Sequence, residues 1–213
     1  MTPSVPVLIR SPWFRWLVTI DLLLMTPHLI GSAATHFGAD VVVADIFKVT
    51  GDGSVPEYFN YLKWALISLI MIQMYSKTRT SLFASLSLVF TLILADDYLQ
   101  LHENLGGWLA TAFPAMGLAH VSGQDLGELL VLSVLGIGIS ASMVLGLMRT
   151  PRMDWGLAMP FAAAFAGLCV CAVGLDLIHA VVVAGGLNVF TSALGLAEDG
   201  GEMIAASLAC AHA

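Results

Sequence analysis

Long apolar runs are the feature that most constrains the fold of this chain. Several of them approach the roughly 20 residues that a helix needs to cross the hydrocarbon core of a bilayer. None shows the alternation of polar and apolar residues that is typical of an outer-membrane barrel, so helices are the way to satisfy the backbone in lipid. The composition agrees, because 58% of the 213 residues are hydrophobic and only 11% are charged. We therefore predict an all-α integral membrane protein.

The spacing of the apolar runs predicts a bundle of about six transmembrane helices that forms a single domain over residues 1–213. The predicted spans cover 13–35, 58–76, 81–104, 124–148, 156–183 and 190–211. Basic residues precede the first run, as they do in a signal peptide. Because that run carries Asp21 and is long enough to span, we interpret it as the first membrane helix.

The basic residues predict the orientation. Six of the eight Lys and Arg residues flank the same ends of the predicted spans, and such residues favour the cytoplasmic side. They are Arg10, Arg15, Lys77, Arg79, Arg149 and Arg152. With an even number of spans, we expect both termini in the cytoplasm and the protein in a bacterial inner membrane. The 36–57 and 105–123 loops and the 184–189 turn then face the periplasm, and we expect them to lie on the membrane surface or to fold over the bundle as a lid.

Ionisable residues gather in the periplasmic halves of four predicted spans. Residues 95–107 read ADDYLQLHENLGG, and such side chains inside a membrane are costly and functional by default. The candidates are Asp96, His102 and Glu103 in span three, Glu128 in span four, Asp176 and His179 in span five, and Glu198 and Glu202 in span six. Residues three, four or seven positions apart share a helix face. We expect them to line one polar core, to which span one adds Asp21 and His28.

Carboxylates held together in a medium of low dielectric cannot all stay ionised without protons, water or a bound cation. A divalent metal, most simply Zn, Fe or Mn, fits a set of carboxylates and imidazoles on facing helices. We predict as ligands Asp96, His102, Asp176, His179, Glu198 and Glu202. Glu103 or Glu128 would serve as a catalytic general base or a further ligand. A structural alternative exists for Asp125, as an acid that stabilises a helix N-terminus, and for each histidine, as a core side chain satisfied by a neighbour.

Two short patterns resemble those of an uncharacterised family of bacterial multi-spanning membrane proteins. They are Asp-Asp-x4-His-Glu at 96–103 and Glu-Asp-x2-Glu-Met at 198–203. The resemblance carries no activity with it. It implies that these two helix faces belong to one site.

Three functions are compatible with these patterns. The first is a metal-dependent enzyme acting on a lipid or another apolar substrate. The second is a cation or proton transporter that uses the same acids and histidines, and the third is an accessory subunit of a larger membrane complex. We expect membrane lipids and, in the third case, other membrane subunits as partners, and no nucleic acid.

Overall fold

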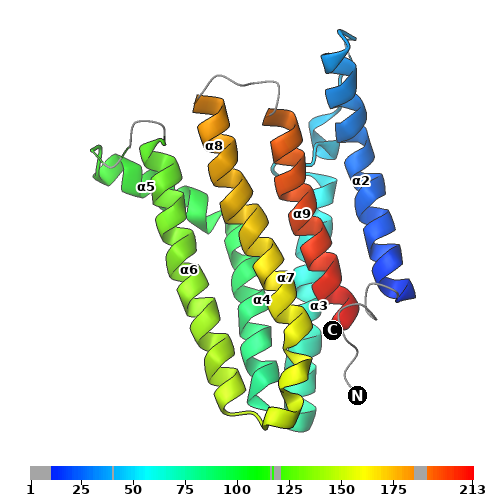
Figure 1. Cartoon of the computed structure of the whole chain (residues 1–213), viewed down its shortest axis with the longest axis vertical. Helices are drawn as coiled ribbons and strands as arrows, with labels where there is room; N and C mark the ends of the chain where they lie inside the picture. The colour runs from blue at the N-terminus through cyan, green and yellow to red at the C-terminus, as the bar shows by residue number, and fades with distance from the viewer. Residues whose placement is uncertain (1–10, 40, 116, 118–120, 185–190) are drawn as a thin grey trace. The chain divides into compact units, whose positions relative to one another are not determined.

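The structure is a computed structural model that describes residues 11–39, 41–115, 117, 121–184 and 191–213, and these residues are almost entirely helical (Figure 1). The α-helices are α2 Pro12–His36, α3 Val55–Thr78, α4 Ser81–Leu99, α5 Leu101–Ala112, α6 Gly123–Met148, α7 Met159–Cys169, α8 Asp176–Ala184 and α9 Thr191–His212. Short 3-10 helices cover Asp45–Phe47 and Arg152–Leu157, and η3, Val170–Leu175, is a π-helix that joins α7 to α8. Arg10 and nearly all of the predicted 184–189 turn lie outside the described residues.

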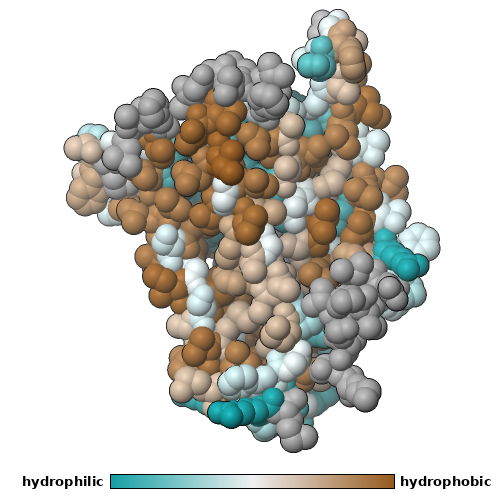
Figure 2. All heavy atoms as spheres, viewed as in Figure 1, coloured by the Kyte–Doolittle hydropathy of each residue, from teal (hydrophilic) through white to brown (hydrophobic). Residues whose placement is uncertain are grey.

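Four helical stretches are long and apolar enough to cross a membrane: Pro12–His36, Ser81–Leu99, Gly123–Met148 and Asp154–Val183. Large apolar side chains such as Trp13, Val134 and Ile137 are exposed, and Figure 2 shows apolar side chains over most of the face in view. A surface of this kind is compatible with lipid rather than water. These features confirm a helical, membrane-embedded protein. α3 and α9 are 24 and 22 residues long but fall outside this apolar group, so their role as spans stays a prediction.

The prediction of six helices needs correction. With α7, η3 and α8 counted as one continuous stretch, the described residues form seven helices. The added helix is α5, because the predicted span 81–104 breaks after Leu99. Gln100 adopts a left-handed conformation (φ 49°) that ends α4 and starts α5. α5 then occupies the first part of the predicted 105–123 loop.

The chain packs as two compact units. Unit 1 comprises Met1–Lys63 and Pro160–His212, and unit 2 comprises Trp64–Met159. The single helix α3 therefore supplies its first turns to unit 1 and the remainder to unit 2. The prediction of one domain remains a prediction.

Unit 1 is built on the contact between α2 and α9. Its buried apolar cluster contains Met25, Val49 and Met203, with Phe59 packed beside them. Ser32 Oγ, near the end of α2, lies 2.6 Å from Ser192 Oγ, near the start of α9. The two helices are therefore antiparallel. We call the end of unit 1 at which α2 finishes and α3 begins the loop end.

Unit 2 joins α4, α5 and α6, and α6 runs alongside α4 (Figure 1). Trp64 stacks on Phe90 with ring centroids 5.7 Å apart, and its indole Nε1 donates to Asp97 Oδ2 at 3.0 Å. The backbone N–H of Leu82 donates to Thr150 Oγ1 at 3.2 Å. This last bond holds the α3–α4 turn next to the end of α6.

Candidate functional site

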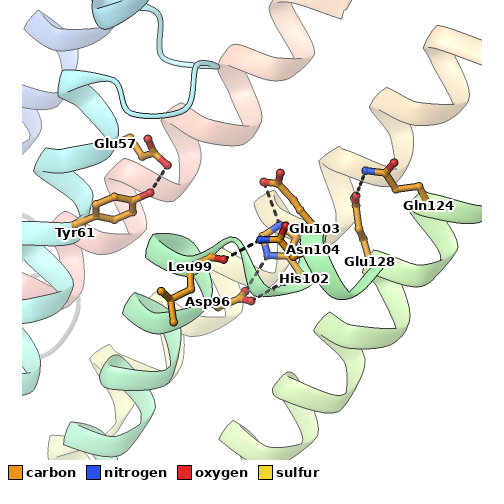
Figure 3. Close-up of polar contacts among 9 residues, drawn as sticks. All are labelled: Glu57, Tyr61, Asp96, Leu99, His102, Glu103, Asn104, Gln124 and Glu128. Carbon is orange, nitrogen blue, oxygen red and sulfur yellow. Dashed lines mark hydrogen bonds and ion pairs between the residues drawn. The ribbon is translucent and has the colours of Figure 1, made fainter. Parts of the chain in front are cut away.

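In unit 2, Asp96 and His102 form a carboxylate–histidine couple at the break between α4 and α5 (Figure 3). Asp96 Oδ1 accepts the backbone N–H of His102 at 3.1 Å, and Asp96 Oδ2 lies 3.0 Å from His102 Nδ1. An ionised carboxylate can only accept, so an ionic form of this contact requires a proton on Nδ1. Asp96 thus stabilises the start of α5 and fixes the orientation of the imidazole ring.

Two further carboxylates lie within electrostatic reach of the ring. His102 Nε2 lies 3.9 Å from Glu103 Oε1, and Glu128 of α6 is within electrostatic reach of the imidazole. Glu128 accepts a hydrogen bond from Gln124 Nε2 at 2.8 Å. A Cβ atom on Gly106 would lie 2.6 Å from the backbone nitrogen of Glu128. The glycine therefore permits the close approach of α5 and α6 that brings Glu128 to this cluster.

Unit 1 contains a second acidic cluster on α8 and α9. His179 Nδ1 lies 3.4 Å from Glu198 Oε2, and the charge of Asp176 acts on Glu198 as well. Asp199 lies within electrostatic reach of Glu198, Asp176 and Glu57. The cluster lies on the loop-end side of Met203, since α9 begins at that end.

Unit 1 also contains a buried ion pair. Lys63 Nζ donates to Asp21 Oδ1 at 2.9 Å, and the side chains are 1% and 0% exposed. The ammonium also donates to the Met203 carbonyl oxygen at 2.8 Å and to Ser207 Oγ at 3.3 Å. Ser207 in turn donates to Asp21 Oδ2 at 2.5 Å. All three ammonium hydrogens thus have acceptors in a site closed to solvent.

The predicted site residues divide between the units. Asp96, His102, Glu103 and Glu128 belong to unit 2, whereas Asp176, His179, Glu198 and Glu202 belong to unit 1. The structure joins Asp96 to His102, His102 to Glu103, and His179 to Glu198. One polar core that contains all eight residues remains a prediction.

Asp125 has the structural role that we considered for it. Ser122 Oγ accepts the backbone N–H of Asp125 at 3.1 Å, and Asp125 Oδ2 accepts the backbone N–H of Ser122 at 3.0 Å. This reciprocal pair is a capping box at the start of α6. The capping box accounts for the acidic side chain of Asp125 without a bound metal ion or other ligand.

The arrangement does not support the predicted metal centre. Among the residues that the structure describes, no group of three or more His, Cys, Asp or Glu side chains is arranged to hold a metal ion. A zinc site ordinarily needs three or four protein ligands. The Zn, Fe or Mn ion stays a prediction, and we derive no chemical step through it.

Lys63 and Ser207 are two polar residues of the buried ion-pair site that the sequence analysis did not single out. Lys63 lies inside the predicted span 58–76, and a lysine within an apolar span needs an acidic or carbonyl partner. That signal pointed to a partner such as Asp21. Ser207 gave no signal, because small hydroxyl residues are common on helix faces that pack in membranes.

No curated protein and no solved structure matches the chain. One family does match, over residues 16–213, and it is described as a domain of unknown function (DUF8692). The match covers nearly all of both units. The chain therefore belongs to the DUF8692 family.

Proposed function

We propose that the protein moves protons across the membrane and that the Asp21–Lys63 pair of unit 1 is the central relay. The observation that carries this proposal is the full burial of two opposite charges, 2.9 Å apart, inside a helical membrane protein. Ionisable groups in such a place are costly to keep and commonly serve proton or ion pathways.

The geometry of the pair suits a proton better than a larger ion. Asp21, Lys63 and Ser207 are in direct hydrogen-bond contact and closed to solvent, so no cation needs to fit between them. Transfer of one proton from Lys63 Nζ to Asp21 Oδ1 converts the ion pair into a neutral amine and a carboxylic acid. A proton taken up by the amine and another lost by the acid restore the ion pair, with one proton carried through.

The acidic cluster of unit 1 supplies a place to collect protons near the loop end. Asp199, Met203 and Ser207 follow one another at four-residue spacing on α9 and so fall along one side of the helix. Asp199 and Ser207 are separated by about 12 Å of helix. Met25 and Met203 occupy the intervening level, so a proton collected by the acids must pass these apolar side chains to reach the relay.

Proton flux into liposomes tests this function. A potential imposed with potassium and valinomycin should drive acidification, read with a trapped pH-sensitive dye. The Asp21→Asn, Lys63→Met double variant keeps the buried volume without a titratable pair, and we expect it to abolish the flux. Lys77→Met, an exposed lysine at the end of the same helix, is the matched control and should retain it.

Two outcomes would overturn the proposal. A folded double variant with unchanged flux would make the pair structural, as expected for an accessory subunit. No flux from the wild-type protein would have the same meaning. Elemental analysis of the same preparation tests the alternative of a metal-dependent enzyme. Stoichiometric Zn, Fe or Mn that is lost on His102→Ala or Glu198→Ala would favour a metal centre over proton transport.

A further inference from the structure

Two buried polar atoms of unit 1 have no hydrogen-bond partner among the described residues. They are Asn60 Oδ1 on α3 and His28 Nε2 on α2. Asn60 is only 7% exposed. Buried polar atoms are nearly always bonded to protein or to ordered water, and an orphan costs more in a membrane than in a water-soluble core.

Both atoms lie on the loop-end side of the Asp21–Lys63 pair. Asn60 comes three residues before Lys63 on α3, which runs away from the loop, and His28 comes seven residues after Asp21 on α2, which runs towards it. Separations of three and seven residues return to nearly the same helix face. The two orphan atoms therefore continue, in one direction, the helix faces that carry the ion pair.

Apolar side chains lie beside the ion pair on its loop-end side. Phe59 lies against the Lys63 ammonium, with Nζ 4.9 Å from the ring centroid, and Met25 and Met203 belong to the buried cluster. A buried water needs about two to four polar partners, and Asn60 Oδ1 and His28 Nε2 are two polar atoms of unit 1 that could serve as such partners.

We propose that water bound at Asn60 Oδ1 and His28 Nε2 connects the Asp21–Lys63 pair with the surface at the loop end. In this arrangement a water molecule donates to the Asn60 carbonyl oxygen, and others continue to the imidazole. Asn60 and His28 are positioning residues for this water, and Asn60 need not exchange a proton itself. The inference rests on the proposed proton transport for its purpose, but the hydration is a separate physical claim.

Thiol accessibility tests the hydration directly. Asn60→Cys and Leu62→Cys are compared on the full chain with Cys169, Cys171 and Cys210 replaced by alanine. Leu62 is two residues away on the same helix and 52% exposed on the outer surface of the protein. A small, charged, membrane-impermeant thiosulfonate is added to vesicles of each orientation. We expect the thiol at position 60 to react at least about tenfold faster than the one at position 62, corresponding to about 1.4 kcal/mol, and only from the loop-end side.

Equal, slow reaction at both positions would overturn the inference, as would faster reaction from the opposite side. This readout does not depend on flux. A reactive position 60 in a protein that conducts no protons would remove the proposed transport and leave the water-filled site standing.

A second variant separates a route from a structural role. Asn60→Leu replaces the polar group with an apolar side chain of similar size, so it should lower the proton flux at least about tenfold without lowering the unfolding temperature. Asn60→Asp keeps an oxygen for the water and should restore most of the flux. Unchanged flux in a folded Asn60→Leu protein would show that protons do not pass this residue.

Discussion

The Lys63 side chain carries a charge although it is only 1% exposed, and its ammonium group donates to three acceptors. We expect Lys63→Met or Asp21→Asn alone to lower the free energy of unfolding by about 3–5 kcal/mol, since each leaves a buried partner without its counter-charge. The Asp21→Asn, Lys63→Met double variant should return to within about 1 kcal/mol of the wild type. Unfolding in detergent, analysed as a double-mutant cycle, measures these values.

The chain offers an exposed ion pair as the control. Lys48 Nζ lies 2.6 Å from Asp45 Oδ1, but the side chains are 45% and 93% exposed. Water and salt screen such a pair, so Lys48→Met should leave the unfolding midpoint unchanged. Additive effects at Asp21 and Lys63 would mean that the two charges do not depend on each other.

At the same scale, the sequence predicted polar residues better than it predicted their partners. Asp21 was recognised as a polar residue of span one, but helix spacing relates residues of one helix only. The bond from Lys63 to Asp21 joins two helices, and the carbonyl of Met203 comes from a third. Such contacts depend on how helices rotate and pack, which composition and periodicity leave open.

At the scale of elements, the apolar runs predicted the positions of the helices well but did not predict where a helix is interrupted. α2 and α6 lie within a residue of the predicted spans 13–35 and 124–148. The break at Gln100 was missed because glutamine is an unusual residue for a left-handed helix end, where glycine or asparagine is usual. Asp96 supplies the compensation by accepting the backbone N–H of His102. The sequence could not predict this hydrogen bond, because the bond forms only where the helix breaks.

The crossing of α5 and α6 provides a test at this scale. A Cβ atom on Gly127 would lie 2.5 Å from the Gly106 carbonyl oxygen and 2.8 Å from its Cα. These are backbone atoms, so the helices must separate. We expect Gly127→Ala to lower the free energy of unfolding by about 1–3 kcal/mol, as overpacking does in a dense core.

Gly136 of the same helix is the matched control for Gly127. A Cβ atom there meets nothing within 4 Å, so Gly136→Ala should keep or raise stability through the greater helix propensity of alanine. Thermal unfolding of the three proteins in one detergent gives the comparison. Equal stability of the two alanine variants would show that the α5–α6 crossing opens without cost.

At the scale of the whole molecule, the basic residues predict the orientation in the membrane. Lys77 and Arg149 lie next to the two turns that the Leu82–Thr150 hydrogen bond holds together. Two basic turns at one end of unit 2 reinforce each other as a cytoplasmic signal. If α3 spans the membrane, its start at Val55 then faces the side opposite to Lys77 at its end.

Labelling of intact cells by a membrane-impermeant maleimide checks this orientation. On the background without native cysteines, we expect Asp45→Cys to react in intact cells, and Lys77→Cys and Arg149→Cys to react only after the membrane is opened. Reaction of all three in intact cells would mean that α3 does not cross the bilayer. The reverse pattern would place the basic turns outside, and protons would then reach Asn60 from the cytoplasm. The same labelling therefore fixes which compartment feeds the Asp21–Lys63 pair.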